Sequence, residues 1–337
     1  MTRRSRLRFW LLVPVAVLLL LLGLLINAWQ PDRPVDDLKA RWAPPPSQWM
    51  SVDGMQVHWR DEGRRDDPRP MVLIHGTSAS LHTWDGWVAT LAPAHRVIRL
   101  DLPGFGLTGP SPEGDYSLQA YVEHLRRFLD QVPVSQVVLV GNSLGGQIAL
   151  TMALEHPERV DGLILIDSAG YAFQPKSIPL GFRLARSDWA APIARYLLPR
   201  SLVAASVRNT YGNPDRVSPE LIDRYFELNL RAGNRDALIQ RFRQTRYDEG
   251  ADRIAELKLP TLIIWGGQDR LIPPENGERF HRDIQGSELR VFPQLGHVPQ
   301  EEDPRVTVAA ARRFLDCLPS DAGPMGTTEP AASAIPQ

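Results

Sequence analysis

The stretch Gln136-Val137-Val138-Leu139-Val140-Gly141-Asn142-Ser143-Leu144-Gly145 decides the fold. Its first half is apolar and rich in β-branched residues, which predicts a buried strand, and residues 146–154 after it predict a helix. Gly-x-Ser-x-Gly at such a turn lifts the serine out of the sheet edge, and the glycines permit a close backbone approach. The alternative is a glycine-rich turn with a solvated serine. We take Ser143 as the candidate nucleophile.

Further short apolar runs indicate that this strand belongs to a larger sheet. A hairpin is expected over Ser51–Trp59, with Asp53-Gly54 at its turn. The other runs are continuously apolar, which is typical of parallel strands buried on both faces. The pattern therefore predicts an α/β fold with a mostly parallel eight-stranded sheet and helices on both faces. The other expected strands span residues 71–75, 96–100, 162–166, 261–265 and 289–292.

The interval between Ile166 and Thr261 is too long for a plain connection. It covers about 95 residues, and a structureless loop of that length is implausible in a compact domain. Aromatic and leucine residues recur there at helix-compatible intervals. We therefore expect an inserted helical cap over about residues 171–250.

A serine nucleophile needs a base, and that base needs an orienting carboxylate. His297 follows the last expected strand in Leu295-Gly296-His297-Val298-Pro299, and Asp269 follows the strand before it. Since the ends of parallel strands meet at one sheet edge, both side chains would reach Ser143. Alone, such a histidine or aspartate is more often a turn or cap residue. Asp167, at the end of the strand over residues 162–166, is the rival acid.

Two backbone N–H groups are the expected donors for an oxyanion. Leu144 supplies one, beside the nucleophile, and the loop after the strand over residues 71–75 supplies the other. Thr77 is the first choice in that loop and Ser78 the second. His75 is expected to organise the loop rather than to catalyse.

Composition excludes several classes of function. The chain has 337 residues, 43% of them apolar and 23% charged, so it can bury a core. Its 38 basic and 39 acidic residues balance, which argues against nucleic acid as a partner. A single cysteine, Cys317, excludes an internal disulfide and a CxxC metal or redox motif.

The first 29 residues have the pattern of a membrane anchor. Arg3, Arg4, Arg6 and Arg8 precede Phe9–Ile26, which contains no charged residue. As a helix this run spans about 27 Å, close to the hydrocarbon thickness of a bilayer. A cleaved signal peptide is the alternative. The basic flank predicts a single-pass inner-membrane protein whose remaining chain lies on the periplasmic side.

Two further segments are expected to lack a packed fold. Residues 30–48 are rich in proline and charge and predict a linker, and residues 319–337 predict a disordered tail. The catalytic domain is then expected over residues 49–318.

These segments resemble the α/β-hydrolase superfamily, in its serine-triad branch with a helical cap, which includes esterases and lipases. Besides the residues quoted above, the resemblance rests on Leu73-Ile74-His75-Gly76, on residues 101–106 (DLPGFG) and on residues 265–273 (WGGQDRLIP). It implies Ser143 as nucleophile, Asp269 as acid and His297 as base, and it implies no metal or organic cofactor. Asp101 is expected to stabilise a turn.

The resemblance also ranks the possible activities. Haloalkane dehalogenases and epoxide hydrolases of this fold carry an aspartate where this chain has Ser143. Meta-cleavage-product hydrolases usually have a tryptophan after the catalytic histidine, and here that residue is Val298. We therefore expect hydrolysis of an apolar carboxylic ester. Carbon–carbon hydrolysis and a catalytically silent, membrane-tethered binding protein are the alternatives, and the oligomeric state stays open.

Overall fold

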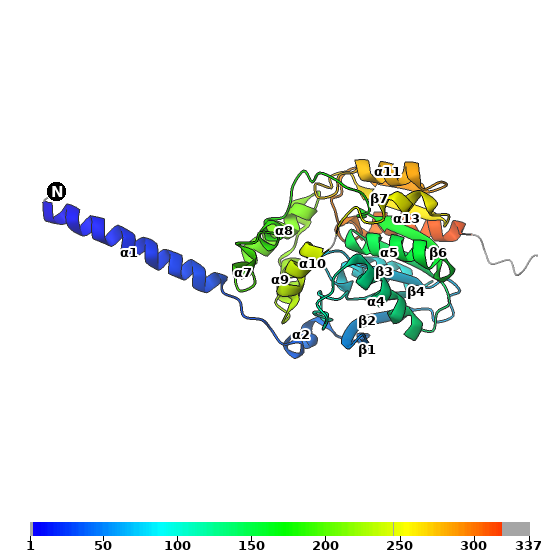
Figure 1. Ribbon diagram of the computed structural model, residues 1–337, viewed down its shortest axis with the longest axis horizontal. Helices are drawn as coiled ribbons and strands as arrows, with labels where there is room; N and C mark the ends of the chain where they lie inside the picture. Colours follow the sequence, from blue (N-terminus) through cyan, green and yellow to red (C-terminus); the bar gives the residue numbers. More distant parts are fainter. Residues whose placement is uncertain (1–2, 245, 319–337) are drawn as a thin grey trace, which may run out of the picture.

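An eight-stranded sheet forms the centre of the computed structural model, which describes residues 3–244 and 246–318 (Figure 1). The strand order is β1-β2-β4-β3-β5-β6-β7-β8. The β1–β2 and β2–β4 pairs are antiparallel, and every other neighbouring pair is parallel. The strands are β1 Gln48–Val52, β2 Met55–Gly63, β3 Met71–Ile74, β4 Arg96–Leu100, β5 Val137–Asn142, β6 Val160–Ile166, β7 Thr261–Gly266 and β8 Glu288–Phe292.

The predicted fold class is confirmed, and the hairpin turn expected at Asp53-Gly54 is present. Asp53 and Gly54 connect β1 to β2 with φ of 51° and 75°. Both values lie in the left-handed region that a two-residue hairpin turn of this type requires.

Both faces of the sheet are buried, as the continuous apolar runs predicted. In β5, Val137 and Leu139 belong to one core cluster, whereas Val138 and Val140 belong to the other. Successive side chains of a strand point to opposite faces, so helices must cover both. The first cluster includes residues of α4 Leu118–Gln131, α5 Leu144–Glu155 and α11 Glu275–Asp283, and the second includes residues of α3 Asp85–Leu91 and α13 Pro304–Cys317.

A group of helices occupies the chain between β6 and β7, where the inserted cap is expected. In Figure 1, α7 to α10 lie between α1 and the sheet. Val298, next to His297, packs in the same apolar cluster as α8 and α9, so the cap and the end of the sheet share a core. The cap helices are α6 Leu180–Ala185, α7 Ala191–Ala194, α8 Arg200–Thr210, α9 Pro219–Asn229 and α10 Asn234–Gln244.

Short helices complete the described elements. They are η1 Leu81–Trp84, η2 Pro157–Arg159, η3 Pro214–Arg216, η4 Ala251–Glu256 and α12 Pro299–Glu302.

Residues 30–48 differ from the unpacked linker that the sequence suggested. They contain α2 Val35–Trp42, whose Leu38 is buried against Leu107 and Leu228. Asp36 and Asp37 lie in the first turn of α2, and Lys39 and Arg41 lie in its last turn. These charges complement the helix dipole, so a short amphipathic helix forms where prolines and charges alone suggested extended chain.

The N-terminal segment forms α1 Arg3–Ala28, which projects away from the rest of the molecule (Figure 1). Among the helical residues whose side chains are described, no run is long and apolar enough to cross a membrane. In α1, the side chains of residues 3–12, 14, 21 and 24 are outside that set. The anchor therefore stays a prediction, and the tail predicted over residues 319–337 lies outside the described residues.

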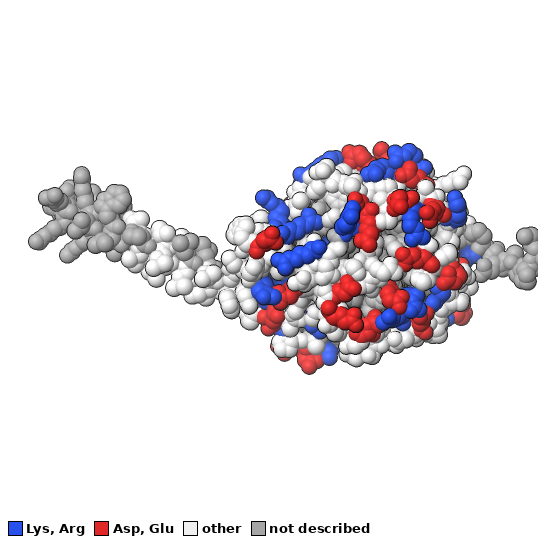
Figure 2. All heavy atoms as spheres, viewed as in Figure 1, with Lys and Arg blue, Asp and Glu red and all other residues white. Residues whose placement is uncertain are grey.

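Acidic and basic side chains lie next to one another over much of the face shown in Figure 2. Ion pairs between acidic and basic side chains of the molecule include those of Arg126 with Glu123 and Asp130. On this face, acidic and basic side chains are thus interspersed, in keeping with the near-neutral net charge of the chain.

Candidate active site

Ser143 occupies the turn between β5 and α5. Its φ is 56° and its ψ is −115°, a strained backbone conformation for a residue with a side chain. The Ser143 N–H donates to the carbonyl of Ile166 (3.0 Å), which fixes the turn against the end of β6. Strain that persists at such a turn requires support from its surroundings. The structure therefore has the local geometry expected for a nucleophile elbow.

The two glycines of the motif are required by close backbone contacts. A Cβ at Gly141 would lie 2.1 Å from the carbonyl oxygen of Gly145. A Cβ at Gly145 would lie 2.2 Å from the carbonyl oxygen of Ile74. Any larger residue at either position would force the backbone apart, which explains why the sequence has glycine at both.

Asp269 and His297 form a buried hydrogen bond beside this turn. The His297 Nδ1 and Asp269 Oδ2 atoms are 2.7 Å apart. Asp269 Oδ1 accepts from the N–H groups of Leu271 (2.7 Å) and Ile272 (3.1 Å), so its carboxylate is held at both oxygens. Within the described part of the chain, no hydrogen bond joins Ser143 Oγ to His297, although both side chains line one cavity. Such contacts are often long in the absence of substrate.

Three groups that the sequence analysis missed hold the His297 loop in place. Asn142 Nδ2 donates to the His297 carbonyl (3.0 Å) and the Ile166 carbonyl (3.1 Å). The His297 N–H donates to the carbonyl of Thr210 in the cap (2.7 Å). Glu302 Oε2 accepts from the N–H of Gly296 (2.8 Å) and from that of Gly212 in the cap (2.9 Å). No sequence pattern signalled these contacts, because most of their partners are far apart in the chain.

The loop after β3 lies against the nucleophile. A Cβ at Gly76 would lie 3.1 Å from the Ser143 Cβ, so the backbone of Gly76 lies close to the nucleophile. Thr77 is the next residue along the chain. The next residue, Ser78, has a φ of 60°. His75 Nδ1 donates to the Gly76 carbonyl (2.8 Å) and Nε2 accepts from the Leu102 N–H (3.0 Å). These bonds agree with the expected organising role of His75, and burial lowers its pKa.

The N–H groups of Thr77 and Leu144 are free to serve as oxyanion donors. Neither takes part in a hydrogen bond among the residues that the structure describes. The Leu144 N–H stands at the first residue of α5, where the helix has no partner for it.

Asp167 brings a second carboxyl to the same sheet edge, as expected for the rival acid. One ligand-type atom each of Asp167, Asp269 and His297 lies within 4.8 Å of the others, and all three residues are buried. These residue types also bind metals, and here His297 Nδ1 is already hydrogen-bonded to Asp269 Oδ2. Burial and the neighbouring Asp269 raise the pKa of Asp167 well above its usual range.

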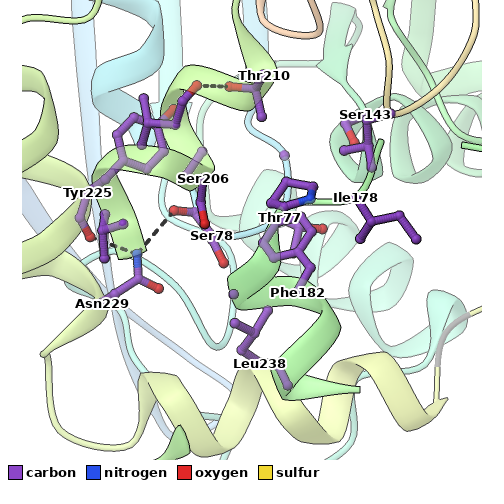
Figure 3. A pocket seen from close by; sticks show the side chains of 18 of the residues that line it. Thr77, Ser78, Ser143, Ile178, Phe182, Ser206, Thr210, Tyr225, Asn229 and Leu238 are labelled. Carbon is purple, nitrogen blue, oxygen red and sulfur yellow. Dashed lines mark hydrogen bonds between the residues drawn. The ribbon is translucent and has the colours of Figure 1, made fainter. Parts of the chain in front are cut away.

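The cavity that Ser143 and His297 line is largely apolar and extends into the cap (Figure 3). Its polar side chains mostly have partners in the protein. Ser206 Oγ donates to the Leu202 carbonyl (2.8 Å), and Thr210 Oγ1 donates to the Val207 carbonyl (2.8 Å). The apolar wall includes Ile178, Phe182, Leu197, Leu198, Leu238 and Ile239.

A second serine–histidine–aspartate arrangement lies where the chain enters the sheet. The Ser47 Oγ is 2.8 Å from His58 Nε2, and His58 Nδ1 is 2.7 Å from Asp101 Oδ2. Asp101 also accepts from the N–H groups of Leu81 (2.7 Å) and Leu107 (2.8 Å), which matches its expected role in a turn. We call Ser47, His58 and Asp101 the entry cluster.

Comparison with known proteins gives a consistent result. A family described as alpha/beta hydrolase fold matches residues 69–304. The 2-hydroxy-6-oxo-2,4-heptadienoate hydrolase of Pseudomonas putida is 30% identical over 275 residues, which cover 78% of this chain and 93% of that protein. A meta-cleavage product hydrolase of Pseudomonas fluorescens has a TM-score of 0.70 at 24% identity, over 80% of this chain and 97% of that one. A thermophilic esterase from Thermogutta terrifontis has a TM-score of 0.68 at 25% identity, over 81% of this chain and 100% of that one.

Proposed function

Since the chain belongs to the alpha/beta-hydrolase family, we propose that it is a serine hydrolase that cleaves carboxylic esters through an acyl-enzyme intermediate. The observation that carries this proposal is the buried Asp269–His297 hydrogen bond beside a strained Ser143. A serine in that position needs only a base to become a nucleophile.

In the proposed reaction, His297 Nε2 takes the Ser143 hydroxyl proton while Oγ attacks the ester carbonyl. Asp269 keeps the proton on Nδ1 and stabilises the imidazolium that forms. The N–H groups of Thr77 and Leu144 hold the oxyanion. His297 then passes its proton to the leaving alcohol, and afterwards it activates the water that releases the acid and frees Ser143.

The cavity supports an apolar acyl or alcohol group. Its wall is formed mainly by aliphatic and aromatic side chains of the cap, and the Ser206 and Thr210 hydroxyls already have protein partners. A long apolar group would remove this surface from water without separating these two hydroxyls from their hydrogen-bond partners.

The test is a series of p-nitrophenyl esters of increasing chain length, with Ser143→Ala as the matched control. We expect kcat/KM to rise with the length of the acyl chain and to be lost in the variant. Absence of turnover across the whole series by well-folded protein would contradict ester hydrolysis.

Carbon–carbon hydrolysis is the second candidate, because a 30% identical relative is named a 2-hydroxy-6-oxo-2,4-heptadienoate hydrolase. Its substrate is a dienoate and thus has a carboxylate. Arg235 lines the cavity and pairs with Asp32, but its Nε and Nη1 are buried without a partner. That side chain offers donors for a carboxylate.

Arg235→Met separates the two candidates. If the substrate is a dienoate, the variant raises its KM by about tenfold or more and affects ester turnover little. Turnover of a 2-hydroxy-6-oxo-dienoate faster than of any ester would replace the first candidate with the second.

We also propose that residues 1–29 anchor the protein in the inner membrane, with the catalytic domain on the periplasmic side. The support is the arginine-flanked apolar run Phe9–Ile26, in which Leu18, Leu20 and Ile26 are more than 60% exposed to solvent. Protease treatment of spheroplasts tests this orientation. The catalytic domain should be digested without detergent, and its protection would contradict the proposal.

A further inference from the structure

The chemistry proposed above uses Ser143, His297 and Asp269 but leaves a fourth buried group beside them without a role. Asp167 follows β6 directly, and its carboxyl is completely buried. Its φ is 44°, a conformation that aspartate tolerates better than most residues but that still costs energy. The Asp167 N–H donates to the Ile264 carbonyl (3.0 Å), so the strained residue is pinned to the end of β7.

Two buried carboxyl groups this close cannot both be ionised at low cost. The hydrogen bonds show which of them holds the charge. Asp269 accepts from the N–H groups of Leu271 and Ile272 and pairs with His297, so three donors stabilise its carboxylate. Asp167 accepts at Oδ1 from one N–H, that of Gly266 (3.0 Å). Its buried Oδ2 accepts from no donor among the described residues, and the Asp269 side chain lies close enough to accept a hydrogen bond from a protonated Asp167.

We propose that Asp167 is a positioning residue for the reaction: it stays protonated, presents the proton on Oδ2 to Asp269, and thereby limits the basicity of His297. This proposal rests on the proposed function, because it assigns His297 as the base. The nearby charged groups are Asp269 after β7, His297 after β8 and Glu302 in α12. Both acidic neighbours disfavour a second negative charge at Asp167, which agrees with the direction of its pKa.

The protonated carboxyl has a consequence for the proton on His297. A donor beside Asp269 withdraws part of its negative charge, so the Asp269 carboxylate attracts the imidazolium less strongly. Loss of that donor would strengthen the attraction between Asp269 and the imidazolium and would leave less free base at mildly acid pH. Asparagine at position 167 keeps a donor and an acceptor in place of the neutral acid, whereas leucine keeps neither.

Infrared spectroscopy tests the protonation directly and needs no substrate. We expect a carbonyl band of a protonated carboxylic acid at neutral pH in the full-length protein, and its loss in Asp167→Asn. An unchanged spectrum in the variant would overturn the proposal. Because the protein is not turning over, this result stands even if the natural substrate is not an ester.

The pH dependence of fluorophosphonate labelling at Ser143 tests the effect on His297. Asp167→Asn should label within about threefold of the wild-type rate with the same acid limb, because it imitates the neutral acid. Asp167→Leu should move that limb to higher pH by about one unit. Identical profiles for the wild type and both variants would show that Asp167 is only structural and would overturn the proposal.

A double variant extends the test. In Asp269→Asn, Asp167 loses its main acidic neighbour and only the weaker influence of Glu302 remains, so Asp167 can lose its proton to solvent and supply a carboxylate to His297. We expect labelling to fall about 100-fold in Asp269→Asn and about 10,000-fold when Asp167→Asn is added. Equal losses in the single and double variants would contradict a protonated Asp167 able to replace Asp269.

Discussion

The candidate site and the entry cluster contain the same three residue types, yet the structure gives them different properties. In the entry cluster, Ser47, His58 and Asp101 are linked at 2.8 and 2.7 Å. In the candidate site, a hydrogen bond joins only the histidine and the aspartate. If the distances between the three side chains were the only criterion, Ser47 rather than Ser143 would be chosen as the nucleophile.

The difference lies in the backbone and in access. Ser143 has a strained turn, a helix N-terminus beside it and a place on a cavity wall, whereas Ser47 is not among the residues that line that cavity. The Ser47 Oγ also accepts from Arg60 Nε (2.9 Å), and His58 is completely buried. The entry cluster thus attaches the segment before β1 to the sheet, and a serine–histidine–aspartate set becomes reactive only where substrate can reach it.

The largest expected effect separates the two serines. Ser143→Ala should lower ester turnover by about 10,000-fold or more, because no nucleophile remains. Ser47→Ala should stay within about twofold of the wild type. Both variants are assayed with a p-nitrophenyl ester and a fluorophosphonate probe. Loss of labelling in a folded Ser47→Ala protein would reverse the roles assigned to the two clusters.

Substitution of His297 should mainly lower kcat, whereas substitution of His58 should mainly lower the free energy of unfolding. His297→Gln removes the proposed base, so kcat should fall about 1,000-fold or more with little change in unfolding free energy. His58→Gln leaves Asp101 and Ser47 poorly paired in the interior, which should reduce the free energy of unfolding by about 2–3 kcal/mol. Denaturant unfolding and kcat are measured on both proteins. A stable His58→Gln protein with a collapsed kcat would contradict this division.

A smaller effect is expected where the cap holds the His297 loop. Glu302→Gln cannot accept all of the hydrogen bonds from Gly212, Asn213 and Gly296. A misplaced base should lower kcat by about tenfold, with a smaller change in KM. Glu288→Gln, on the exposed side of β8, is the matched control. Equal kcat in the two variants would show that the clamp does not position His297.

A further expected effect concerns acid stability next to the entry cluster, and it leaves activity at neutral pH unchanged. Burial lowers the pKa of His82 to about 3, so the folded protein keeps this imidazole neutral while the unfolded chain binds a proton below pH 6.5. The free energy of unfolding should therefore decline as the pH falls from about 6.5 to about 3. His82→Gln should make that decline shallower in denaturant titrations at several pH values. An equally steep decline in the variant would assign the acid sensitivity to other groups.

Much of this comparison was accessible from the sequence. The strand runs, the Asp53-Gly54 turn and the order of Ser143, Asp269 and His297 all follow from local patterns, which is why the fold class was predicted correctly. The sequence could not reveal the supports of the site. Asn142, Glu302 and Thr210 act through partners that only the folded chain brings near. The helix α2 was missed because its charges and the prolines on either side of it mask a short amphipathic pattern.

The hydrogen bond from the His297 N–H to the Thr210 carbonyl limits how this enzyme can be re-engineered. A Cβ at Gly212 would lie 2.3 Å from the Gln294 carbonyl oxygen, so the cap and the β8 loop meet there without spare room. The cap is consequently not an interchangeable module. A chimera that imports a foreign cap has to keep residues 210–213 from this chain, and libraries aimed at new substrates are better placed at Phe182, Leu238 and Ile239 on the cavity wall.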